Sequence, residues 1–169
     1  KRIRTTALDN HVKSVAGIYN SFLYRRPIVR DLGSLDQDML MAFMADADLD
    51  GRSFDAMMRE VSLQSMIYGH VWVVMDKPAV QVGTRAEELE QGIRPYMSIY
   101  TTENVLDWNY QRQPNGKYEL NYFKVKEAPN KNEQYVREFL TDEVNVYRYN
   151  GDEDKDTASL ESTTPNQLG

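Results

Sequence analysis

The sequence contains no cysteine and only two histidines, His11 and His70, among its 169 residues. Without cysteine there can be no disulfide and no thiolate metal site. Two histidines leave little for a zinc site or a histidine-based catalytic relay. Long hydrophobic runs are also missing, since no stretch approaches the roughly 20 apolar residues of a membrane-spanning helix. The N-terminus lacks the apolar segment of a signal peptide. The chain begins with Lys1 rather than Met, so we expect it to be a piece of a longer protein.

Motifs of the common enzyme classes are also absent from the sequence. There is no nucleophile elbow of the G-x-S-x-G kind and no phosphate loop of the G-x-x-x-x-G-K-[ST] kind. Glu60, Asp76 and Asp107 are conceivable acid–base carboxylates, but their spacing selects none of them, and carboxylates of this frequency are usually solvated. The sequence therefore predicts a protein that is not an enzyme and needs no cofactor or metal.

The chain is rich in apolar and aromatic residues, and its charged residues are unevenly distributed along the sequence. Hydrophobic residues make up 41%, and eleven tyrosines, five phenylalanines and two tryptophans favour a folded, strand-rich part. The net charge is −6, but residues 1–30 carry +6 and the remainder carries −12. This uneven charge distribution fits a subunit whose basic end contacts the acidic body of a neighbouring subunit. It does not fit a protein that binds tightly to double-stranded DNA, because such proteins usually have a net basic face. A solvated basic helix is the simpler interpretation.

Apolar spacing of three and four residues predicts three helices in the first part of the chain. The first covers residues 3–24, where Ile3, Ala7 and Leu8 begin the apolar face. The second runs from about residue 36 to 45, with Ser34 or Asp36 as its cap. The third runs from about residue 53 to 68, with Ser53 as a candidate cap and Gly69 as its end.

After Gly69 the pattern changes to strands. HVWVVMD and PYMSIY read as strands, with a short helical turn at AEELE between them. Two hairpins follow, one about Asn115-Gly116 and one about Thr141-Asp142. We therefore predict an α+β fold over residues 1–150, with N-terminal helices followed by an antiparallel β-meander. Residues 151–169 have lost their aromatics and are predicted to be an acidic polar loop or a disordered end.

The stretch from Asp46 to Met57 resembles a calcium-binding loop in part. Asp46, Asp48, Asp50 and Gly51 match the first, third, fifth and sixth positions of such a loop. The twelfth position needs a bidentate glutamate, and here it is Met57, which falls on the apolar side of the third helix. We therefore favour a structural loop in which the aspartates bind free amides, and keep a calcium-regulated monomeric binding module as the alternative function.

Six aromatic residues suggest a second alternative, a stacking platform for single-stranded nucleic acid. They are Trp72, Trp108, Tyr110, Tyr118, Tyr122 and Phe123. Trp72 sits in the most apolar run and is predicted to be core. Trp108 and Tyr110 share a face by alternation, but lysine and arginine are not concentrated beside them, so the platform is disfavoured.

Three stretches in this order resemble the N-terminal half of the portal proteins of tailed bacteriophages. They are VAGIYNSFLYRRPIV, LDGRSFDAMMREVSLQSMIYGHVWVVMDKP and RPYMSIYTTENVLDWNY, and the resemblance covers roughly residues 1–150. It implies the wing region, the outer α+β part of a portal, whereas the long stem helix and the clip are not recognisable here.

The resemblance implies a structural subunit in a homo-oligomeric ring of usually about twelve copies at one capsid vertex. Double-stranded DNA would pass through the ring during packaging and ejection, and capsid protein, the terminase motor and head-tail connector proteins would be partners. The location would be the virion, and the host cytoplasm during assembly, without a membrane. Because basic residues exceed acidic ones near the first helix, Arg25, Arg26 and Arg30 are the candidates for subunit contacts.

Overall fold

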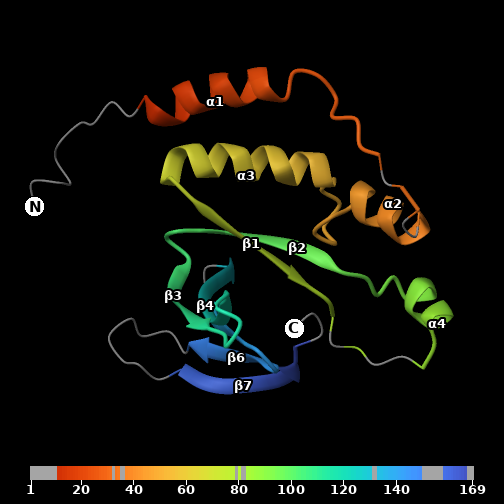
Figure 1. The fold of residues 1–169 in the computed structure, drawn as a ribbon, viewed down its shortest axis with the longest axis vertical. Coiled ribbons are helices and arrows are strands. Elements are labelled where there is room, and N and C mark those ends of the chain that lie inside the picture. The colour runs from red at the N-terminus through yellow and green to blue at the C-terminus, as the bar shows by residue number, and fades with distance from the viewer. Residues whose placement is uncertain are drawn as a thin grey trace, which may run out of the picture. The chain divides into compact units, whose positions relative to one another are not determined.

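The computed structural model of the protein describes residues 11–31, 33–34, 37–78, 80, 83–130, 133–149 and 158–166. Helices come first and antiparallel strands follow, which confirms the predicted α+β fold (Figure 1). The chain divides into two compact units, Lys1–Val71 and Trp72–Gly169, a division that the sequence analysis does not anticipate. We describe each unit by itself.

The described residues of the first unit form the helices α1 (Val12–Leu23), α2 (Gln37–Ala45) and α3 (Phe54–Tyr68). Both predicted ends of α3 are confirmed. The Ser53 hydroxyl accepts a hydrogen bond from the Ala56 amide at 3.3 Å, and Gly69 has a φ of 85° after the last turn. Residues 3–10 of the predicted first helix and the candidate cap Asp36 lie outside the described residues.

Helix α1 lies beside α3, and polar bonds to main-chain atoms form much of their contact (Figure 1). Asn20 donates to the Arg59 carbonyl at 3.0 Å, and the Tyr24 hydroxyl donates to the Met58 carbonyl at 3.0 Å. Ala16 is the one buried residue of α1. Helix α3 therefore lies against the side of α1 that carries Ala16 and Asn20, and the C-cap residue Tyr24 continues this side at a spacing of four residues.

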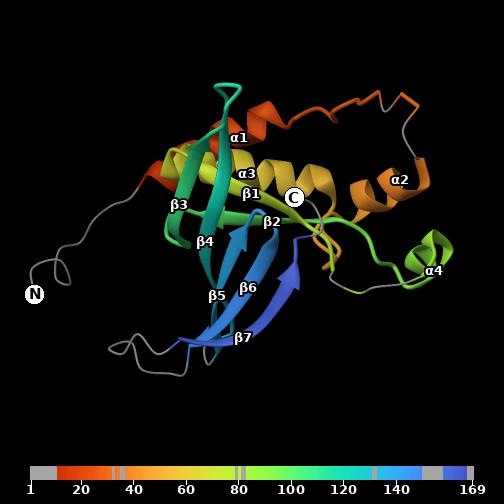
Figure 2. The same cartoon turned by 60° about the horizontal axis from the view of Figure 1, so that its bottom comes forward.

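The second unit contains two sheets (Figure 2). The first is formed by β1 (Val71–Asp76) and β2 (Tyr96–Thr101), with the short helix α4 (Arg85–Glu90) between them in the sequence. The second sheet has five antiparallel strands in sequence order, which confirms the predicted meander. These strands are β3 (Val105–Arg112), β4 (Tyr118–Asn130), β5 (Glu133–Leu140), β6 (Glu143–Tyr149) and β7 (Ala158–Pro165).

Strand β7 corrects the prediction that residues 151–169 form a loop or a disordered end. It pairs with β6 from Glu143↔Pro165 to Tyr149↔Ala158, and the Thr163 hydroxyl donates to the Asn145 side chain at 2.7 Å. As the last strand of the sheet it exposes most of its side chains, so it needs neither the aromatics nor the apolar alternation that mark inner strands. Residues 151–157 lie outside the described residues.

The predicted hairpins are both present, but the turn between β3 and β4 differs from the expected one. Gly116 has a φ of 84°, whereas Asn115 is not at positive φ. The Asn115 side chain instead accepts a hydrogen bond from the Lys117 amide at 2.9 Å, and the Gly116 amide donates to the Gln113 carbonyl at 2.8 Å. Only the glycine therefore uses the left-handed region in this turn.

The core of the second unit forms where the two sheets meet. Tyr100, Phe123 and Val125 are buried, and Trp72, Val74, Val105 and Phe139 pack against them. The rings of Trp72 and Phe123 lie 4.7 Å apart between centroids, which confirms Trp72 as part of the core. Phe123 also contacts Tyr100 and Phe139, so it joins side chains from both sheets.

Replacing Phe123 by alanine should lower the free energy of unfolding by about 3–5 kcal/mol, because the side chain is 3% exposed and lies among aromatic rings. Leu160→Ala on β7 is the control, since that side chain is 57% exposed and its loss should cost less than about 0.5 kcal/mol. Urea denaturation measures both changes. Equal effects would show that Phe123 is not at the centre of the core.

Candidate functional site

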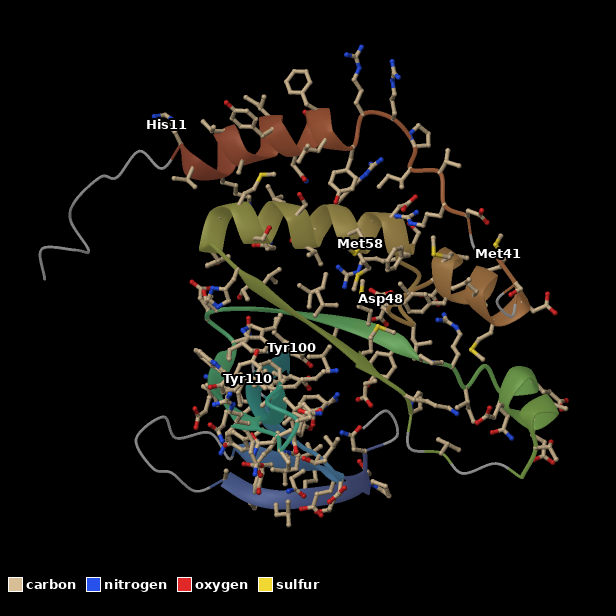
Figure 3. The ribbon with its side chains drawn as sticks, in the orientation of Figure 1. His11, Met41, Asp48, Met58, Tyr100 and Tyr110 are labelled. Atoms are coloured by element: carbon tan, nitrogen blue, oxygen red, sulfur yellow. The ribbon has the colours of Figure 1, made fainter. Side chains whose placement is uncertain are left out.

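The acidic loop between α2 and α3 is held together by its own aspartates (Figure 3). The Asp46 carboxylate accepts from the Gly51 amide at 2.8 Å. One oxygen of Asp48 accepts from the amides of Asp50 and Arg52, both at 3.0 Å, and the other lies 2.5 Å from the Arg52 guanidinium. The backbone reverses through positive φ at Leu49 and Gly51. These carboxylates serve as acceptors for loop amides, as the structural interpretation predicts.

The electrostatics of Asp48 agree with this role. Burial alone would raise the pKa of Asp48, but the hydrogen bonds from Arg52 and Asp50 and the Arg52 charge outweigh it, so the pKa lies below its ordinary value. Met57, at the twelfth position of the loop, is fully buried. Among the described residues, no group of three acidic or histidine side chains is placed to hold a metal ion.

A second polar cluster joins the two sheets of the second unit, centred on Arg137 of β5. Its guanidinium lies 3.2 Å from the Asp76 carboxylate at the end of β1 and 3.3 Å from the Glu127 carboxylate on β4. Two tyrosines of β2 complete the cluster: Tyr96 donates to Asp76 at 2.9 Å, and Tyr100 donates to Glu127. One cation thus binds two carboxylates that come from different sheets.

The groups of this cluster shift one another's pKa values. Burial alone would lower the pKa of Arg137, but the charge of Glu127 and the contacts with Tyr100 and Tyr96 raise it. Burial and the neighbouring Glu127 raise the pKa of Tyr100, so its phenol stays protonated and donates to that carboxylate. The cation and the two carboxylates of the cluster are therefore paired with one another, although the buried Nε of Arg137 has no hydrogen-bond partner.

The three carboxylates considered for acid–base chemistry have separate partners. Glu60 accepts a hydrogen bond from Gln64 one turn later on α3. Asp76 belongs to the Arg137 cluster, and Asp107 accepts from the Trp108 amide at 2.9 Å. Each of the three carboxylates therefore lies in a different local setting. The Arg137 cluster, by contrast, escaped the sequence analysis because its members are up to 61 residues apart.

Helix α1 of the first unit carries a group of exposed apolar side chains. The side chains of Val15, Ile18, Tyr19 and Phe22 are between 49% and 65% exposed. Beside them an open groove of about 450 Å³ runs between α1 and Met66 of α3, with His11 and Tyr19 in its lining. The sequence pattern identifies these residues as one face of a helix, but α3 does not cover that face.

The three candidate arginines for subunit contacts differ in their surroundings. Arg25 and Arg26 follow α1 directly and are exposed. Arg30 lies 2.5 Å from the Asp55 carboxylate and over the Phe54 ring at 5.0 Å, so its guanidinium is already engaged at the start of α3. Arg25 and Arg26 are therefore better placed than Arg30 for a contact with another molecule.

Five of the six aromatic residues considered as a stacking platform divide into two sets, and the sixth, Tyr122, is half-buried on β4 opposite Asn109. Trp72 and Phe123 belong to the core. Trp108, Tyr110 and Tyr118 lie on the β3–β4 hairpin and are between 47% and 67% exposed. Trp108 still contacts Trp72, with 5.7 Å between ring centroids, and Arg112 lies 5.8 Å over the Tyr118 ring. Trp108 and Tyr110 are thus both partly exposed on the hairpin, and Arg112 stacks on the neighbouring Tyr118.

The lowered pKa of Asp48 predicts a pH-dependent stability. A carboxyl group whose folded pKa is below its ordinary value of 3.8 stabilises the protein above that pH, and this stabilisation is lost as the pH falls through the folded pKa. Asp48→Asn should therefore cost about 1–2 kcal/mol at pH 7 and progressively less below about pH 4. Urea melts at several pH values measure the difference. Asp50→Asn keeps the Asp48 hydrogen bonds and controls for net charge; a pH-independent cost at Asp48 would contradict the assignment.

Removal of the Arg137 guanidinium should be strongly destabilising. Arg137→Ala leaves Asp76 and Glu127 half-buried without their cation, at a cost of about 3–5 kcal/mol. Arg112→Ala, which removes an exposed guanidinium from the hairpin, should cost less than about 1 kcal/mol. Chemical denaturation compares the two variants. Similar small losses would mean that the cluster does not join the sheets.

Comparison with known proteins identifies no family for this chain. No protein-family model matches the chain, and no curated protein sequence matches it. No helix in the described part of the chain has both the length and the apolar character to cross a membrane. The function is therefore argued from the residues, from their geometry and from the resemblance of the three sequence stretches.

Proposed function

We propose that the protein is a portal subunit of a tailed bacteriophage and that this chain forms the wing-like part of it. The ordered set of three stretches carries the proposal. In the structure these stretches correspond to α1 with its connector, to α3 with β1, and to β2 with β3. The subunit would build a ring at one capsid vertex, admit and release double-stranded DNA, and dock the packaging motor and the tail connector. The subunit would not be an enzyme, and hydrolysis would belong to the packaging motor.

Charge distribution supports this function. Residues 11–30 carry four basic and no acidic side chains, whereas the second unit carries 17 acidic and 11 basic ones. A ring needs two different surfaces that attract each other, and opposite net charge supplies that attraction. An acidic body also repels phosphates, so duplex DNA would pass it without being held.

The alternative function is a monomeric binding module regulated by calcium through the Asp46–Asp50 loop. The bonds within that loop disfavour it, because the Asp48 oxygens already bind two amides and the Arg52 guanidinium. A thermal melt with and without millimolar calcium separates the two functions. The portal subunit should show no change in melting temperature, whereas ion binding to the folded state would raise it.

Ring formation is the direct test of the proposal. Electron microscopy of the full-length protein should show closed rings with rotational symmetry and a central channel, because heterologous contacts with a fixed rotation close on themselves. Single particles without symmetry, at every protein concentration and ionic strength tried, would contradict the portal function.

Charge reversal at Arg25 and Arg26 should weaken assembly. The double variant Arg25→Glu/Arg26→Glu replaces two exposed cations next to α1, and native mass spectrometry should show fewer multimers than for the wild type. Arg112→Glu/Lys117→Glu makes the same change in net charge at the hairpin tip and should not weaken assembly. Undisturbed multimers in the first variant would exclude these two arginines from the subunit contact.

A further inference from the structure

Helix α1 carries an apolar stripe that the first unit leaves exposed. Helix α3 lies against the side of α1 that carries Ala16 and Asn20. The stripe lies on another side, and its four side chains are between 49% and 65% exposed: Val15, Ile18, Tyr19 and Phe22. They are the first, fourth, fifth and eighth in a run of eight residues, so they share one face of the helix. Large side chains at this spacing are the usual anchors of a helix that packs on an apolar surface.

Helix α2 has a second exposed apolar face. Its residues from Met39 to Ala45 are all apolar, and a helix that is apolar on every side is normally buried on every side. One side of α2 is covered in the first unit, where Phe43 packs on Phe54 with 5.6 Å between ring centroids. The other side is exposed and consists of Asp38, Met41, Ala42 and Ala45 (Figure 3). The composition of α2 therefore predicts that a further surface covers this side.

The charges beside the two faces have opposite signs. Residues 11–30, which include α1, carry no acidic residue and four basic ones, namely Lys13, Arg25, Arg26 and Arg30. Residues 37–52, which include α2, carry a single cation, Arg52, which is paired with Asp48. The same residues carry four aspartates, namely Asp38, Asp46, Asp48 and Asp50. Each apolar face is therefore set among charges of mainly one sign.

This charge pattern selects what covers each face. Two copies of α1 would bring positive charges together, and two copies of α2 would bring negative charges together, so both arrangements cost free energy. Contact of α1 with α2 instead places opposite charges beside two apolar faces. The exposed apolar face of the β3–β4 hairpin does not complement α1, because Arg112 stacks there on Tyr118.

The two faces do not cover each other within one copy. Helix α1 lies alongside α3, whereas α2 lies at the beginning of α3 (Figure 1). Phe22 on the stripe is 65% exposed while Met41 on α2 is 59% exposed. A contact between the stripe and α2 therefore requires two copies of the chain.

We propose that the α1 stripe of one copy packs on the exposed face of α2 in a second copy. The small side chains of Ala42 and Ala45 leave room on α2 for the large side chains of the stripe. The two faces differ, so each copy keeps one free α1 and one free α2 after a single contact. Such a contact is heterologous and builds rings or open chains. The inference rests on the proposed function and names the surfaces of its subunit contact.

Cross-linking through introduced cysteines tests the contact, because the chain has no cysteine of its own. Phe22→Cys and Met41→Cys replace exposed side chains, so neither variant should unfold the protein. An oxidised mixture of the two full-length variants should form disulfide-linked dimers with one copy of each, since a disulfide needs Cα atoms within about 7 Å. Leu160→Cys on β7, mixed with Phe22→Cys, is the matched control and should stay unlinked.

Three cross-linking results would overturn the contact. A mixture of Phe22→Cys and Met41→Cys that links no better than the control would contradict it directly. Disulfide-linked dimers of Phe22→Cys alone, at the level of the mixture, would show that two stripes pack on each other. A chain with both substitutions that closes its disulfide within one copy would show that α1 covers α2 of the same copy.

Weakened association is the second measurement. Ile18→Gln/Phe22→Gln keeps the helix propensity of α1 and removes two anchors, so the full-length variant should associate about tenfold or more weakly in sedimentation velocity. Tyr118→Thr/Leu120→Thr removes exposed apolar side chains from the hairpin and should associate as the wild type does. The reverse result would assign the subunit contact to the hairpin and overturn the inference.

The contact and the proposed function fail in different ways. Closed rings in electron microscopy, with Phe22→Cys and Met41→Cys unlinked, would contradict the contact and leave the portal function in place. Linked cysteines in a protein that forms only open chains would support the contact and contradict the portal function. A wild type that stays monomeric would contradict both.

Discussion

The contact of Arg137 with two carboxylates holds the second unit together at its centre. A two-stranded sheet is marginal on its own, and β1 and β2 gain their stability by lying on the face of the meander. Arg137 reaches from β5 to Asp76 on β1 and to Glu127 on β4, beside the buried Val125. Aromatic rings and Val125 supply buried apolar area in this core, and the guanidinium forms an ion pair with one strand of each sheet.

This constraint has a consequence for the hairpin. The β1–β2 sheet and the aromatic rings of Trp72 and Phe139 cover the base of the β3–β4 apolar face, whereas Tyr118 and Leu120 at the tip are exposed. The same strands therefore serve as core at one end and as free surface at the other. Helix α1 repeats this situation in the first unit, because α3 covers one side of it and leaves the apolar stripe exposed.

Local chemistry made much of the fold predictable. Ser53 caps α3 and Gly69 ends it because hydroxyl capping and positive φ are local preferences that three or four residues decide. The meander follows from alternation and turn residues, although Asn115 acts through its side chain rather than through positive φ. Strand β7 escaped prediction because a polar edge strand carries no apolar signal.

The candidate sites were less predictable, since they depend on which residues meet across the fold. The sequence places Asp76 and Arg137 in different strands, and only the packing of two sheets brings them to 3.2 Å. The apolar spacing of α1 predicts a helix but does not say whether another element of the same chain covers it. The aspartates of the acidic loop could be assigned a structural role early, because Met57 stands where an ion needs a bidentate glutamate.

The proposed function is that of one of many identical subunits around a DNA channel. Electron cryomicroscopy of the full-length protein tests it most directly, because a reconstruction shows both the symmetry and the element that covers α1. The account predicts a closed ring of identical copies around a central channel. A protein that forms no closed assembly, with α1 buried within its own copy, would contradict it.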